Sequence, residues 1–304
     1  MSFVTSKYDK GFLIDMNTIF YKSSQNMCEV SDCSVDLIIT SPPYFNVKDY
    51  SKDGYQSLRH SAVAAGGGGD LGSLTDYKTY IKELVKVWRE CERVLKPNGK
   101  LCVNVPLMPM FKRDLNTHYN RHIFDLQSDI QHSILESTSL FLLDLYIWNR
   151  TNTTKKLMFG SYPYPRNFYA QNTSEFITIY VKDGKPTNNI PEELKEQSKL
   201  SQKEWVQFTK QIWDIPIPNK SNLAFGKHAA IMPEAIPYRP IKLYSFIGDI
   251  VLDPFAGSGT TLKVAKELGR NFIGYEIYPH YKSVIEEKLG ERGLFAIQGQ
   301  DNAQ

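Results

Sequence analysis

The chain has 304 residues, a net charge of +3 and a mean hydropathy of -0.37. Its apolar fraction of 41% supports one large α/β domain, or one domain with an inserted module, and no apolar run approaches the roughly 18 residues of a membrane span. The mildly basic charge neither requires nor excludes a polyanionic partner, so a case for nucleic-acid binding has to rest on local patches.

The cysteines and the N-terminus favour a cytosolic protein. Cys28, Cys33, Cys91 and Cys102 form neither a CxxC pair nor a disulfide framework, and residues 1–7 contain no apolar targeting segment. We therefore expect a reducing compartment and no secretion.

The first elements lead to a buried strand. Residues 11–17 read as a short strand and residues 19–27 as a short helix. Residues 35–40 form an apolar run rich in β-branched side chains, which predicts a buried strand.

Two prolines end this strand abruptly, in the stretch Thr40, Ser41, Pro42, Pro43, Tyr44. They remove two backbone donors and keep Ser41 extended, so carbonyl oxygens and the Ser41 hydroxyl are left as acceptors beside the Tyr44 ring. A plain strand and turn is one interpretation. A site that accepts hydrogen bonds from an amino group and stacks a flat ring is the other.

A Ser/Gly-rich loop and a βαβ unit follow. Residues 45–75 include four consecutive glycines and read as a mobile loop, either a slack linker or, as we favour, a lid over substrate. Apolar residues at helical spacing predict a helix over 76–95, and residues 100–105 read as the next buried strand. The strand at 35–40, this helix and the strand at 100–105 have the order of a parallel βαβ unit, and a further helix over 128–139 and a further strand over 140–148 follow.

His118 and His122 have the spacing of a metal-binding pair, but no third ligand accompanies them. A solvated loop or helix face is the simpler interpretation.

Residues 150–185 are rich in basic and aromatic side chains. Such a stretch fits a nucleic-acid face in which basic groups reach phosphates, or a polar insertion whose aromatic residues belong to the core. The candidate DNA-binding residues are Arg150, Lys155, Lys156 and Arg166. Residues 175–182 then read as a strand, 192–210 as an exposed helix and 214–219 as a linker.

The last third contains a second strand and turn. Residues 250–253 predict a strand, Gly257 and Gly259 a tight turn, and residues 262–268 a helix closed by Gly269. The strand at 271–276 ends in Glu276, and a final helix covers 280–289. This arrangement is typical of a nucleoside-binding βαβ unit, in which glycines let the backbone approach the ligand closely and the acid accepts hydrogen bonds from the ribose hydroxyls. The turn has neither the lysine of a P-loop nor the third glycine of a dinucleotide fingerprint.

The two motifs together resemble S-adenosylmethionine-dependent DNA amino-methyltransferases. Asp253 to Thr260 is similar to the cofactor motif of that family, Ser41 to Tyr44 to its catalytic motif, and residues 227–233 to its methionine-contacting segment. Because the catalytic motif comes first, the order is that of the circularly permuted β group.

The resemblance implies a doubly wound, mostly parallel Rossmann-like sheet with an inserted target-recognition region. It divides the chain into a catalytic half (1–150), a target-recognition region (151–222) and a cofactor-binding half (223–304). It also implies S-adenosyl-L-methionine as cofactor, double-stranded DNA as substrate, a restriction endonuclease as a possible partner, and activity at the nucleoid in the cytoplasm of a prokaryote.

The resemblance further implies site residues. Catalysis falls to Ser41, Pro42, Pro43 and Tyr44, which would hold and stack a base flipped out of the duplex. Cofactor binding falls to Asp253, Pro254, Phe255, Ala256, Gly257, Ser258, Gly259, Thr260, Glu276, Asp15, His228 and Pro233.

The target atom follows from residue types. No cysteine follows a proline, which excludes the covalent route to C5 of cytosine and leaves exocyclic amines. In the family, serine at position 41 is commoner with N4 of cytosine and aspartate with N6 of adenine, so we favour N4. N6-adenine transfer and a non-catalytic DNA-binding relative remain alternatives, and an RNA or protein amide methyltransferase ranks lower.

Overall fold

The computed structural model describes residues 16–45, 70–111, 118, 121–152, 160–186, 190–218 and 232–290. Eight strands of this part of the chain form one mixed sheet in the order β1-β10-β9-β2-β3-β7-β6-β8. Neighbours from β1 to β3 are parallel, β7 is antiparallel to both β3 and β6, and β8 is parallel to β6. In chain order the strands are β1 (Thr18–Phe20), β2 (Val35–Thr40), β3 (Leu95–Pro106), β6 (Phe141–Asn149), β7 (Ser174–Val181), β8 (Ile212–Asp214), β9 (Ile250–Asp253) and β10 (Asn271–Tyr275).

The central strand β2 is mostly apolar because both of its faces are covered. Ile38 belongs to the apolar cluster on one face, and Leu37 and Ile39 to the cluster on the other. A run of apolar residues without alternation is what a strand buried on both sides requires.

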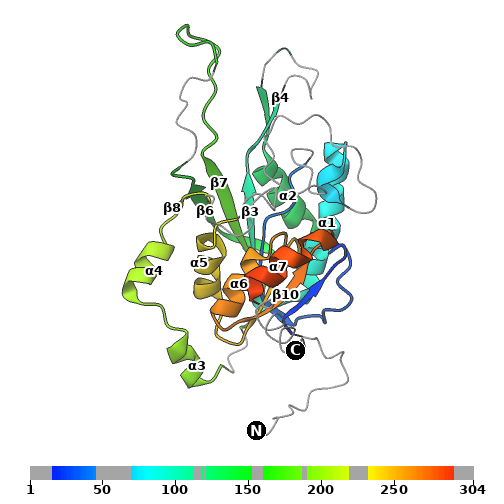
Figure 1. Cartoon of the computed structure of the whole chain (residues 1–304), viewed down its shortest axis with the longest axis vertical. Helices are drawn as coiled ribbons and strands as arrows, with labels where there is room; N and C mark the ends of the chain where they lie inside the picture. The colour runs from blue at the N-terminus through cyan, green and yellow to red at the C-terminus, as the bar shows by residue number, and fades with distance from the viewer. Residues whose placement is uncertain are drawn as a thin grey trace, which may run out of the picture.

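Helices form the two outer layers (Figure 1). One face carries α1 (Tyr77–Val94) and α2 (Leu126–Ser137), and the other carries α5 (Ala235–Tyr244), α6 (Thr260–Glu267) and α7 (Lys282–Leu289). The predicted mostly parallel, doubly wound α/β fold is confirmed.

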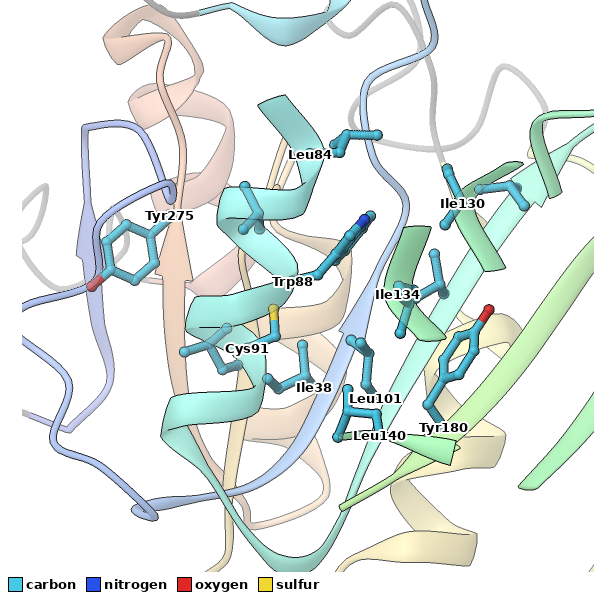
Figure 2. Packing of buried hydrophobic residues seen from close by; sticks show 14 of the residues in the cluster. Ile38, Leu84, Trp88, Cys91, Leu101, Ile130, Ile134, Leu140, Tyr180 and Tyr275 are labelled. Atoms are coloured by element: carbon cyan, nitrogen blue, oxygen red, sulfur yellow. The ribbon is translucent and has the colours of Figure 1, made fainter. Parts of the chain in front are cut away.

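The apolar face predicted for α1 packs into the core, as Figure 2 shows. Leu84, Trp88 and Cys91 are fully buried, in one cluster with Ile38 of β2 and Leu101 of β3. The helix begins where the Asp76 carboxylate accepts the N–H of Thr79 at 2.7 Å. This packing fixes β2 and β3 side by side, so that their ends lie at one edge of the sheet.

Smaller elements complete the fold. An antiparallel pair of β4 (Met108–Phe111) and β5 (Arg121–Phe124) leaves the sheet beyond β3, and Figure 1 shows it projecting at the same end as residues 160–173, which precede β7. The remaining helices are α3 (Glu192–Gln197), α4 (Gln202–Phe208), η1 (Leu71–Ser73) and η2 (Pro279–Tyr281).

Two of the sequence-based predictions are wrong in type or extent. Residues 19–27 are not helical, because Ile19 and Phe20 pair with β10 at the sheet edge and turns follow. The helix predicted over 192–210 is two helices, because Ser201 starts α4 with a reciprocal capping box to Glu204.

The helix α5 was not predicted from the sequence. Pro237 lies in its first turn, where a backbone N–H has no helical partner, and Pro240 lies inside it. The predicted linker at 214–219 begins with the last residue of β8, and Ile215 is buried. Residues 46–69 of the predicted mobile loop lie outside the described residues.

Among the described helices, none combines the length and the apolar character needed to cross a bilayer.

Candidate active site

The two motifs meet at the carboxyl edge of the sheet, because β2 and β9 are parallel neighbours. Where the strands end, Thr40 Oγ1 donates a hydrogen bond to Asp253 Oδ1 at 2.8 Å. The backbone N–H of Phe255 donates to the same oxygen at 3.0 Å. The segment 41–44 and the turn that begins at Asp253 therefore start from one hydrogen-bonded pair.

Asp253 carries a charge where water cannot reach it. Burial raises the pKa of its carboxyl to about 6, although the hydrogen bonds from Phe255 and Thr40 favour the ionised form. At neutral pH most of the molecules hold a negative charge between the two motif turns.

The glycine turn needs its glycines. Gly257 and Gly259 have φ values of 51° and 77°, and Gly259 directly precedes α6. A Cβ atom on Gly259 would lie 2.9 Å from Cγ2 of Ile285 in α7. Only a residue without a side chain fits both the backbone and the space.

Glu276 holds the other side of the turn. Its carboxylate accepts the N–H of Gly257 at 2.8 Å and the N–H of Tyr278 at 2.8 Å. Burial raises its pKa to about 7, and the negative charges of Asp253 and Asp70 act in the same direction. A buried acid held by backbone amides, with each oxygen still able to accept a further bond, suits a ligand hydroxyl.

Asp70 and Tyr278 join the site although no sequence pattern marked them. The Tyr278 hydroxyl donates to Asp70 Oδ2 at 2.7 Å, and Asp70 Oδ1 accepts the N–H of Gly72 at 2.9 Å. The chain that begins at Asp70 is thereby attached two residues beyond Glu276.

Lys288 is a second feature that the sequence did not indicate. This buried lysine of α7 donates to the Ser258 hydroxyl at 2.8 Å and the Thr260 hydroxyl at 2.9 Å. Burial lowers its pKa to about 8. Its two hydrogen bonds tie the hydroxyl groups of the glycine turn to α7.

Polar side chains from four strand ends surround Tyr44. The Tyr44 hydroxyl is 3.5 Å from Ser41 Oγ and donates to Glu175 Oε2 at 3.5 Å. Asn104 Nδ2 donates to the same carboxylate oxygen at 2.8 Å, and Arg150 forms an ion pair with Oε1 at 3.3 Å. These residues follow or belong to β2, β3, β6 and β7, which are neighbours in the sheet.

The other predicted residues are distributed as follows. Pro233 is buried just before α5, next to Glu234, which pairs with Lys263 of α6 at 2.8 Å. Arg166 is exposed between β6 and β7, with a φ of 92°. Pro254 and Ala256 lie in the glycine turn. Asp15, Lys155, Lys156 and His228 lie outside the described residues. Within the described part, no three His, Cys, Asp or Glu side chains are grouped to hold a metal ion.

Comparisons with known proteins give one family and a consistent set of relatives. Residues 35–287 match the model of the N6/N4 methyltransferase family, described as DNA methylase. The chain is 32% identical to the type II methyltransferase M.MjaI of Methanocaldococcus jannaschii, over 91% of this chain and 93% of that protein. It is also 32% identical to the type II methyltransferase M.MthZI of Methanothermobacter thermautotrophicus, over 90% and 76% of the two chains.

Solved structures agree with the fold. The putative DNA modification methylase TTHA0409 from Thermus thermophilus, in its complex with S-adenosyl-L-methionine, matches with a TM-score of 0.68 and 27% identity, over 90% of this chain and 93% of that one. The cytosine-N4-specific PvuII DNA methyltransferase matches with a TM-score of 0.63 over 94% of each chain, at 16% identity, which supports the fold alone.

Proposed function

We propose that this chain methylates N4 of cytosine within a specific duplex sequence. The proposal proceeds from its family: the chain belongs to the N6/N4 DNA methylase family and is an S-adenosylmethionine-dependent DNA amino-methyltransferase of the type II restriction–modification kind. The 2.8 Å hydrogen bond from Thr40 to Asp253 carries the proposal of methyl transfer, since it joins the catalytic and cofactor motifs, and serine at position 41 supports N4 of cytosine as the target.

The cofactor turn fits S-adenosyl-L-methionine. Gly257 and Gly259 allow the left-handed backbone of the turn, and the Glu276 carboxylate would accept the ribose hydroxyls. The Asp253 charge favours a cationic group nearby. When bound, the cofactor supplies a methyl group on a positively charged sulfur. Pro233, His228 and Asp15 would complete the site on the methionine and adenine sides.

The catalytic segment would prepare the amine. An exocyclic amine is a poor nucleophile because its lone pair is delocalised into the ring. If the Ser41 hydroxyl and the Pro42 carbonyl accept its two hydrogens, the nitrogen becomes more tetrahedral and its lone pair is free to attack. The base has to leave the duplex to reach these groups, and Tyr44 would stack on it.

The target base is tested by product analysis. We expect DNA treated with the protein and labelled cofactor to contain N4-methylcytosine at one sequence. If the product is N6-methyladenine, the target is adenine and the proposal of N4 of cytosine is wrong. No transfer to DNA of any sequence would favour a non-catalytic DNA-binding relative.

The role of Ser41 is tested by Ser41→Ala. The variant is expected to lose turnover by about tenfold or more while its affinity for the cofactor stays within about twofold, because the hydroxyl faces the base. Single-turnover rates and calorimetric cofactor titrations separate the two quantities. Equal loss of both would assign Ser41 to the cofactor site.

We further propose the division of labour along the chain. Residues 1–150 and 223–304 would form the catalytic and cofactor halves in the β-group order, and the part of 151–222 that projects from the sheet would recognise DNA. Arg166, and Lys155 and Lys156, would contact phosphates there. Arg166→Ala should then reduce the slope of log K against log salt by about 1. A restriction endonuclease of the same specificity, in the cytoplasm of the same prokaryotic cell, is the expected partner.

A further inference from the structure

A buried carboxylate lies directly behind the catalytic segment. Glu175, the second residue of β7, is 6% exposed. The structure gives it contacts with Tyr44, Asn104 and Arg150, from three other strand ends.

Two side chains besides Tyr44 hold the carboxylate in place. The Arg150 guanidinium pairs with Oε1 and also donates to the backbone carbonyls of Asn172 and Thr173. Asn104 fixes Oε2 at 2.8 Å. A buried carboxylate is costly unless it is paired and hydrogen-bonded, and this arrangement satisfies both requirements.

Because a carboxylate only accepts hydrogen bonds, Glu175 lets us infer a direction for both contacts of the Tyr44 hydroxyl. A phenol has one hydrogen, and Tyr44 gives it to Glu175. The Tyr44 oxygen then acts as an acceptor for its other neighbour, Ser41, whose hydroxyl oxygen is 3.5 Å away. In this direction Ser41 donates its own hydrogen toward Tyr44, and the lone pairs of the Ser41 oxygen can accept a hydrogen bond from a substrate. Contacts of this length commonly shorten when a substrate binds.

We propose that Glu175 is a positioning residue of the methyl transfer. By accepting the Tyr44 hydrogen it orients the Ser41 hydroxyl as a hydrogen-bond acceptor for the exocyclic amine of the target base. Successive hydrogen bonds that end on a charge polarise one another, which makes Ser41 a better acceptor. This inference rests on the proposed function, because Ser41 needs to be an acceptor only if an amine is the substrate.

Arg150 takes a different role in this arrangement from the one its sequence context suggested. Its guanidinium is engaged with Glu175 and the backbone before β7, and it supports the carboxylate.

The test is a double-mutant cycle in which two quantities are measured for each variant. They are kcat, checked against the single-turnover rate, and KM for DNA. Glu175→Gln removes the charge and one of the two acceptor oxygens that Tyr44, Asn104 and Arg150 share, while Tyr44→Phe keeps the ring and removes the hydroxyl. Each single variant is expected to lower kcat by about tenfold with little change in cofactor affinity. If Glu175 acts through Tyr44, the double variant is no slower than Tyr44→Phe alone. Glu136→Gln, an exposed glutamate of α2, serves as the matched control and should match the wild type.

Three results would overturn the inference. They are a Glu175→Gln variant with wild-type kcat, losses that multiply in the double variant, and a loss confined to KM. If Glu175→Gln does not fold, as judged by circular dichroism, the Tyr44→Phe and Ser41→Ala pair tests the contact between Tyr44 and Ser41 on which the inference depends, and losses that multiply there would also overturn it. A wild-type protein that transfers no methyl group to DNA would instead refute the proposed function.

Discussion

The pKa of Glu276 makes cofactor affinity a function of pH. Burial and the charges of Asp253 and Asp70 raise this pKa to about 7, so near neutral pH about half of the molecules carry a protonated carboxyl. A carboxylate accepts bonds from two ribose hydroxyls, whereas a protonated carboxyl loses part of that capacity. If only the ionised form binds, the cofactor has to displace a proton below pH 7.

The expected magnitude follows from this linkage. With a pKa near 7, the affinity is reduced about elevenfold at pH 6, about twofold at pH 7 and hardly at pH 8. Affinity should therefore rise by about tenfold, or about 1.4 kcal/mol, between pH 6 and pH 8. Near pH 7 the complex should release about half a proton.

Isothermal titration calorimetry in two buffers of different ionisation enthalpy measures both the affinity and the proton release. Glu276→Gln is the control, because every other titrating group, including Asp253 and the cofactor, contributes to the pH dependence of cofactor affinity in both proteins. Asp70→Asn removes one of the charges that raise the pKa and should move the transition to lower pH. An affinity difference between wild type and Glu276→Gln that stays constant from pH 6 to pH 8, without proton release, would refute the reasoning.

Three further predictions concern the turn and the pair beneath it. Gly259→Ala should lower the free energy of unfolding by about 1–3 kcal/mol and weaken cofactor binding, because its Cβ atom meets Ile285 and the backbone there is left-handed. Gly248 is the control, since it is also left-handed but a Cβ atom there has nothing within 4 Å. Gly248→Ala should lower the free energy of unfolding by only about 1 kcal/mol and leave cofactor binding unchanged. Thr40→Val keeps the shape but removes the donor to Asp253, so urea denaturation should show a loss of about 1–3 kcal/mol, and an unchanged midpoint would contradict this. The folded-state pKa of Asp253, about 6, lies above its ordinary value of 3.8. The free energy of unfolding of the cofactor-free protein should therefore fall by up to about 3 kcal/mol as pH rises from about 4 to above 6. Asp253→Asn should lack this fall, and identical pH profiles of the two proteins would rule it out.

Local sequence patterns were sufficient to predict an element wherever tertiary packing agrees with the local preference of the segment. The apolar run at 35–40 and the helical spacing over 76–95 predicted β2 and α1 within one or two residues. Pro-Pro after β2 and the paired glycines after β9 marked the two turns that the structure brings together. Prediction failed where tertiary packing opposed local preference, as in α5, whose two prolines argue against a helix while Ile236 and Ile241 bury its apolar face.

The sequence by itself determined the two strand ends, the glycine turn and the acid after β10, because each depends on backbone conformation within a few residues. Only the tertiary structure decided the partners of the side chains. Glu175 looked like one of two acids in a basic stretch, and Lys288 like an ordinary helix residue. The strand order β2-β3-β7-β6 places Glu175 behind Tyr44, 131 positions away, and the packing of α7 places Lys288 against the glycine turn. Such contacts depend on which strands and helices become neighbours, and no local pattern encodes that choice.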